Sequence, residues 1–167
     1  MNKEQFIIFK EEIKKIIGQE IELSLEIKQN GESSILITGN SDTNSFSYIY
    51  AQEPENELAS WQSAHFHNHI VETWIVEKGI MIVYENVLNS ENTYEEIIIK
   101  PGDIYTSKVG VSHNYYLLPG TITHTINISV DNHSFEGDWY LDEKLDEFTK
   151  KINMEELIDF NELEEYL

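Results

Sequence analysis

Residues 65–79 read HFHNHIVETWIVEKG and carry the most informative pattern of the chain. Three histidines, at 65, 67 and 69, alternate with other residues, and Glu72 follows closely. Residues two apart in a strand point to the same face, so His65 and His67 project together, about 7 Å apart. Two imidazoles beside a carboxylate suit a transition metal at neutral pH. The stretch therefore predicts a strand that carries a metal site.

Two motifs around this stretch resemble the two motifs of the cupin superfamily. The first runs His-x-His-x4-Glu-x6-Gly from His65. The second runs Gly-x5-Lys-Val-Gly-x2-His from Gly102 to His113. The resemblance covers about residues 59–117, with 80–100 as the variable hairpin between the motifs. Both motifs occur in the family's order and at its spacing.

The resemblance implies a barrel of six or more strands, often a dimer, that holds one divalent metal ion such as iron, manganese, nickel or zinc. It assigns the ion four ligands: His65, His67, Glu72 and His113. The chain departs from the family at scaffold positions, with Ala59 for the usual Gly, Lys108 for Pro and Leu117 for Asn. These departures concern loop geometry more than metal binding.

His69 is the alternative ligand. His67 and His69 also form a pair two residues apart, but only two residues then separate the pair from Glu72. Because this spacing is shorter than the motif requires, we favour His65 and His67 and keep His69 as a reserve ligand.

The rest of the chain fits a mainly β protein, which we predict to be a single cupin (double-stranded β-helix or jelly-roll) domain over residues 1–167. Apolar residues at three- and four-residue steps predict an amphipathic N-terminal helix within 1–18. From about 20 to 135, short alternating strands are separated by turns, and Asn30-Gly31 is a strong hairpin signal. Apolar stripes in an acidic background predict a helical C-terminal tail over 139–167.

The fifth histidine of the chain, His124, is a candidate general acid or base. If Pro119-Gly120 joins two paired strands, Tyr115 faces His124 on the side that carries the metal ligands. A histidine there has a pKa near neutrality and suits proton transfer or support of a ligand. The other reading is a buried, hydrogen-bonded histidine, and a one-residue error in the loop would turn it outward. We further predict that Tyr115 and Trp74 wall the substrate pocket.

Composition limits the partners. The formal net charge of −20 opposes binding to nucleic acid or anionic lipid. No segment approaches the length of a membrane span, and no signal peptide begins the chain, so we expect a cytoplasmic protein. The absence of cysteine excludes disulfides, iron–sulfur clusters and zinc–thiolate sites. A small-molecule ligand or substrate is the expected partner, with a homodimer suggested by the resemblance.

Three functions compete at this stage. The favoured one is a metal-dependent enzyme with oxygenase- or isomerase-type chemistry on a small organic molecule. The alternative is a non-catalytic module that binds a small metabolite. A storage or structural protein with a vestigial site is disfavoured because all four ligand types are present. The fold does not choose between the first two.

Overall fold

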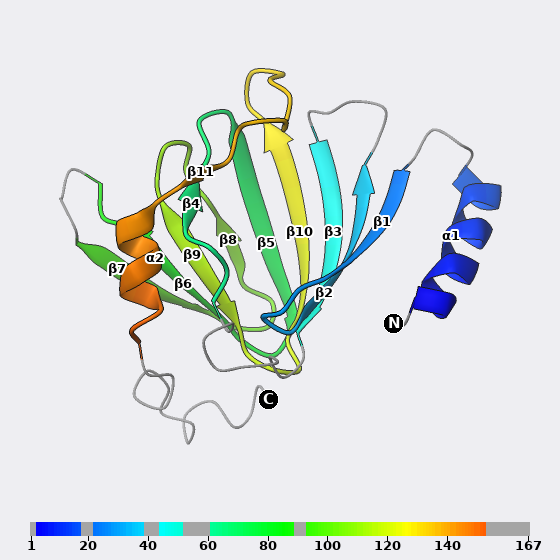
Figure 1. Ribbon diagram of the computed structural model, residues 1–167, viewed down its shortest axis with the longest axis horizontal. Helices are drawn as coiled ribbons and strands as arrows, with labels where there is room; N and C mark the ends of the chain where they lie inside the picture. Colours follow the sequence, from blue (N-terminus) through cyan, green and yellow to red (C-terminus); the bar gives the residue numbers. More distant parts are fainter. Residues whose placement is uncertain (1–2, 18–21, 39–43, 52–60, 89–92, 153–167) are drawn as a thin grey trace.

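The computed structural model describes residues 3–17, 22–38, 44–51, 61–88 and 93–152. About half of them lie in antiparallel strands that form two facing sheets (Figure 1). The larger sheet has six strands in the order β1 (Glu22–Ile27), β2 (Glu32–Thr38), β3 (Asn44–Ala51), β10 (Ile122–Ser129), β5 (Ile70–Lys78) and β8 (Ile104–Thr106). The smaller sheet has five in the order β11 (Tyr140–Leu141), β4 (His65–Phe66), β9 (His113–Leu117), β6 (Met81–Asn86) and β7 (Tyr94–Ile99). The mainly β class predicted from the sequence is confirmed.

The first hairpin forms where the sequence predicts it. β1 pairs with β2 in antiparallel register, with Ile27 opposite Ser33. Gly31 in the connection has a φ of 90°, a left-handed conformation that glycine adopts without steric cost. The Asn30-Gly31 pair therefore marks both the position and the chemistry of this turn.

The core between the two sheets is built from residues that alternate along the strands. It consists of Ile49, Ala51, Trp74, Val76, Met81, Val83, Ile99, Tyr105, Tyr115 and Leu117. The opposite face of the smaller sheet carries a second apolar cluster, which includes Ile80, Ile82, Tyr116 and Leu145. Strand residues of opposite parity thus fill two separate clusters, as the two-residue period requires.

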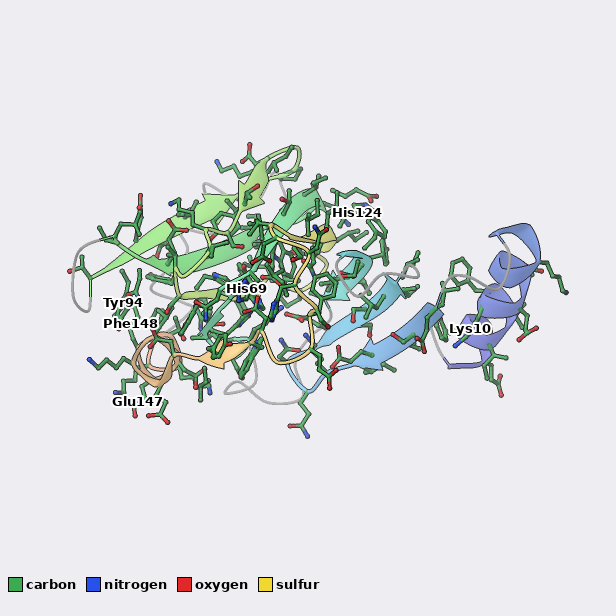
Figure 2. The ribbon with its side chains drawn as sticks, turned by 90° about the horizontal axis from the view of Figure 1, so that it is seen from above. Lys10, His69, Tyr94, His124, Glu147 and Phe148 are labelled. Atoms are coloured by element: carbon green, nitrogen blue, oxygen red, sulfur yellow. The ribbon has the colours of Figure 1, made fainter. Side chains whose placement is uncertain are left out.

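Helix α1 (Lys3–Ile17) packs on the outer face of the larger sheet and lies at the end of the molecule beyond β1 (Figure 1). Phe6 is buried there against Leu23 and Ile35. The ammonium group of Lys10, labelled in Figure 2, donates a 2.6 Å hydrogen bond to the main-chain oxygen of Leu23. The predicted N-terminal helix is confirmed over the residues that the structure describes.

The predicted helical tail is only partly correct. Tyr140 and Leu141 form strand β11, and helix α2 (Glu143–Thr149) begins after them, with Asp142 as its N-cap. Figure 2 shows Phe148 of this helix next to Tyr94 of β7, with ring centroids 4.6 Å apart. The remainder of the predicted tail, 153–167, lies outside the described residues.

The predicted hairpin between residues 113–118 and 121–130 is wrong. β9 pairs with β4 and β6 in the smaller sheet, whereas β10 pairs with β3 and β5 in the larger one. The chain crosses between the sheets after Leu118. Thr121 anchors the crossing, because its hydroxyl donates to the main-chain oxygen of Ile80 at 2.9 Å and accepts from the Ile80 N–H at 3.0 Å. Pro119-Gly120 therefore marks a turn but not a hairpin.

No helix among the described residues has the length and apolar character needed to cross a membrane.

Candidate metal centre

Four side chains from both sheets meet in the space between the sheets. His65 lies on β4 and His113 opposite it on β9, while Glu72 projects from β5 of the larger sheet. His67 follows β4 directly. One potential ligand atom from each of these four residues lies within 4.8 Å of the other three. The two sheets thus bring together the residues that the sequence motifs single out.

Each of the three histidines is oriented by a main-chain carbonyl, to which its Nδ1 donates a hydrogen bond. The carbonyls belong to Ser63 (2.8 Å from His65), Val111 (3.0 Å from His113) and Asp138 (bonded to His67). A proton on Nδ1 leaves Nε2 with a free lone pair. Such outer hydrogen bonds fix the tautomer and ring orientation of metal-binding histidines.

The three Nε2 atoms converge on the carboxylate of Glu72. They lie 3.9 Å (His65), 3.8 Å (His67) and 3.4 Å (His113) from its oxygens. These separations exceed a normal hydrogen bond. Two ligand atoms bound to one ion at about 2.1 Å each lie roughly 3 to 4 Å apart, which matches this spacing.

Two nitrogen atoms of this cluster are buried and have no hydrogen-bond partner. The Nε2 atoms of His67 and His113 are buried and make no hydrogen bond in the structure. Buried polar atoms normally have a hydrogen-bond partner. The free lone pairs on these two Nε2 atoms are therefore suited to bind an ion. The donor set of three imidazoles and one carboxylate therefore fits a divalent transition metal.

The pKa shifts at the cluster keep the donors in the forms that bind a metal. Burial lowers the pKa of His65 to about 4, so its imidazole is neutral at pH 7. Burial raises the pKa of the Glu72 carboxyl, but the nearby imidazoles, His113 foremost, outweigh burial and lower it to about 2. Tyr115 donates a 2.9 Å hydrogen bond to Glu72, and burial raises its own pKa well above 10, which keeps the phenol protonated.

No protein-family model and no curated protein sequence matches this chain. Solved structures match it. CapF, a capsular polysaccharide assembling protein from Staphylococcus aureus, is 20% identical over 72% of the chain, with a TM-score of 0.53. Oxalate decarboxylase from Bacillus subtilis is 10% identical over 75% of the chain, with a TM-score of 0.55. Pac13, a nucleoside dehydratase, is 12% identical over 74%, with a TM-score of 0.50.

This chain has the cupin fold. It covers 34% of CapF and 33% of the oxalate decarboxylase chain, so it spans about a third of the length of each, but it covers 90% of Pac13. At these identities the likeness establishes the fold and nothing further. The cupin architecture predicted from the two motifs is thereby confirmed.

The segment around Asp138, which follows β10, is hydrogen-bonded to the histidine loop, residues 67–69. The carboxylate of Asp138 is fully buried and accepts 2.9 Å hydrogen bonds from the main-chain N–H groups of Asn68 and His69. The main-chain oxygen of the same residue accepts from His67. Asp138 therefore holds both the loop and one imidazole of the cluster.

The aromatic residues beside Asp138 cover the same strand. Trp139 stacks on His65 with ring centroids 5.2 Å apart, and Tyr140 stacks on Phe66 at 5.2 Å. In Figure 1, β11 lies along β4, where this contact forms. Sequence reasoning missed Asp138 and Trp139, because their separation of about 70 residues from the motif gives no local signal.

Two cavities lined by described residues adjoin the cluster. The larger, of about 280 Å³, is lined by His65 and Trp139 together with Trp61, Gln62 and Ser63. The smaller, of about 140 Å³, is lined by Glu72 and Trp74 and extends along the inner face of the larger sheet. Trp74 lines this smaller cavity, and its role as the wall of a substrate pocket stays a prediction. Tyr115 lies fully buried behind Glu72 and lines neither cavity.

The predicted position of His124 is wrong. In β10 it is paired with Ile75 and Tyr48, whereas the next residue, Thr125, shares the inner face with Trp74. His124 therefore faces outward, where its Nε2 lies 2.6 Å from a carboxylate oxygen of Glu77. Because the chain crosses to the larger sheet before β10, His124 does not pair with Tyr115 and lies on the outer face.

His69, the reserve ligand, points away from the cluster. Its Nδ1 lies 2.7 Å from a carboxylate oxygen of Asp131, and its ring stacks on that of His133 with centroids 4.0 Å apart. Figure 2 shows His69 well separated from His124. His69 thus contacts Asp131 and His133, whereas His65 and His67 face Glu72.

Proposed function

We propose that this cupin is a metal-dependent enzyme that acts on a small organic molecule, with His65, His67, Glu72 and His113 as the ligands of one divalent ion. The observation that carries the proposal is the convergence of three Nε2 atoms on one carboxylate, each with its Nδ1 held by a carbonyl. Iron, manganese, nickel and zinc are the metals that such a donor set accepts.

When bound, the ion supplies Lewis-acid polarisation of a substrate oxygen and a template that orients the substrate. The protein supplies the rest. Tyr115 restrains the carboxylate of Glu72 through its hydrogen bond, which fixes the direction of the oxygen that does not accept it. The depressed pKa of His65 keeps its imidazole from competing for a proton at neutral pH.

Access is provided by the two cavities, which approach the cluster from the sides of His65 and of Glu72. Trp139 and Trp74 form apolar surfaces next to these two residues and limit the water beside them. A cluster that is buried yet adjoins a cavity suits a reaction centre better than a structural metal site, in which all positions are closed. Pac13, an enzyme of which the chain covers 90%, supports the view that a barrel of this size suffices for catalysis.

The test is a turnover screen of the metal-loaded protein beside the His113→Ala variant. The anaerobically iron-loaded protein is mixed with catechols, thiols and diketones while dioxygen uptake is recorded, and the nickel- and zinc-loaded forms are assayed for aldose–ketose exchange. We expect turnover with the native protein and its loss in the variant. Tight binding of a compound with no turnover across the screen would instead support the non-catalytic binding module.

A further inference from the structure

The inner face of the larger sheet is polar beside the metal centre, where a barrel core is normally apolar. Four residues make up this polar wall: Ser34 of β2, Ser47 of β3, and Thr125 and Asn127 of β10. The first three are more than nine-tenths buried. Inward-facing strand positions usually carry Val, Ile or Leu. Serine and threonine at such positions bury less apolar surface, so packing of the core does not explain them.

The strand register carries the polar wall up to the metal centre. Asn127 lies directly opposite Glu72 on one side and Ser45 on the other. Thr125 lies opposite Ser47 and is one pleat farther from Glu72. Directly opposed residues have Cβ atoms about 4.5 to 5.5 Å apart. A molecule that contacts the wall therefore also reaches the neighbourhood of the carboxylate.

The polar wall has unused hydrogen-bonding capacity. The hydroxyl of Thr125 and the amide oxygen of Asn127 are buried and have no hydrogen-bond partner. Both residues line the cavity of about 140 Å³ that also contacts Glu72. Buried hydroxyl and amide groups are normally paired. Groups of this kind that face a cavity are suited to pair with a ligand.

The charges around the polar wall select against an anionic ligand. Lys28 also lines the cavity, but its ammonium lies 3.5 Å from the buried carboxylate of Glu32. Gln62 donates to both oxygens of that carboxylate, at 2.9 and 3.0 Å. Among the described residues that line the cavity, Lys28 is the one cation, while Glu26 and Glu72 add negative charge. The side chains that line the cavity therefore offer an anion no unpaired positive partner.

We propose that the polar wall binds a neutral, multiply hydroxylated compound, a sugar or a linear polyol, with its hydroxyls paired to Thr125, Asn127 and the two serines. This inference rests on the proposed function, because the wall places such a compound beside the proposed metal. The ring of Trp74, buried at the same cavity, offers an apolar face to the C–H groups of the ligand. Neutral hydroxyls match the uncharged hydroxyl and amide groups of the wall.

The test compares ligand classes by calorimetry on the zinc-loaded full chain. The probes are neutral monosaccharides and linear four- to six-carbon polyols, against dicarboxylates of the same length. Thr125→Val removes one hydroxyl with little change of shape, and Ser47→Ala is a second variant should the first fail to fold. Thr73→Val is the matched control, because Thr73 lies on β5 with the opposite parity to Trp74 and bonds to Thr106 on the outer face.

We expect neutral compounds to bind and Thr125→Val to weaken their binding about tenfold, the value of one lost hydrogen bond. Thr73→Val should leave the affinity unchanged. Tighter binding of the dicarboxylates, an unaltered affinity in Thr125→Val, or no binding of any neutral probe at 50 mM would each overturn the inference. Metal content and turnover are measured on the same samples. Polyol binding that depends on Thr125 without any turnover would refute the enzyme but leave the inference standing.

Discussion

Replacement of Asp138 by Asn tests whether the segment after the barrel holds the histidine loop. The carboxylate is fully buried, and each oxygen accepts one main-chain N–H at 2.9 Å, from Asn68 and from His69. Asparagine keeps one acceptor but turns an NH2 group toward the second N–H. One charge-assisted hydrogen bond is then lost and a buried donor is left unpaired.

Hydrogen bonds to charged groups contribute about 1.5 to 3 kcal/mol each. We therefore expect Asp138→Asn to lower the free energy of unfolding by about 2 kcal/mol, measured by urea unfolding of the metal-free protein. The main-chain oxygen of Asp138 also orients His67, so a shifted segment should weaken metal binding by roughly 10- to 100-fold, the usual effect of losing an outer hydrogen bond. Zinc affinity is measured by competition with a chromophoric chelator.

Asp131→Asn is the matched control. Asp131 contacts the side chain of His69 in the same loop, but its carboxylate is exposed. The same chemical change there should alter neither the unfolding free energy nor the zinc affinity. Equal effects of the two variants, or an Asp138→Asn protein with unchanged stability and zinc affinity, would refute the proposed role of the segment.

Two further predictions concern the fold and its pH dependence. Gly79→Ala should lower the free energy of unfolding, measured in urea, by about 3 kcal/mol. Gly79 has a φ of +77°, and an added Cβ would lie 2.5 Å from Thr121 Oγ1 and 2.7 Å from the Thr121 Cα. Gly102 has a φ of +90° but no atom within 4 Å of such a Cβ, so Gly102→Ala should lower the same free energy by only about 1 kcal/mol. Because burial lowers the pKa of His65 from 6.5 to about 4, the unfolded chain binds its proton at higher pH than the folded chain does. The unfolding free energy of the metal-free protein should therefore fall by about 3 kcal/mol as the pH falls from 6.5 to 4. His65→Gln should flatten that dependence. A native profile that is level over this range, or the same profile in His65→Gln, would contradict the lowered pKa of His65.

Only part of the convergence of the four candidate ligands could be predicted from local rules. The two-residue period of a strand places His65 and His67 on one face, and the fixed spacing of the motif places Glu72 on the adjoining strand. The distant His113 required the resemblance to a known family, since no local rule pairs β4 with β9. The carbonyl partners of the imidazoles could not be foreseen from side-chain types.

The failures come from long-range pairing. The sequence places His124 on the inner face only if strands that are neighbours along the chain also pair with each other. The chain instead crosses to the other sheet at Thr121, and the register of β10 with β3 and β5 places His124 on the outer face. Asp138 was missed for the same reason, because its partners lie about 70 residues away.

The metal content of the purified protein tests the central claim most directly. Elemental analysis is made after reconstitution with excess metal and desalting, on the native chain, on His113→Ala and on His124→Ala. The account predicts about one transition-metal ion per chain in the native protein and in His124→Ala, whose imidazole faces outward, and none retained by His113→Ala. A native protein that retains no metal under these conditions, or equal loss in the two variants, would contradict the account.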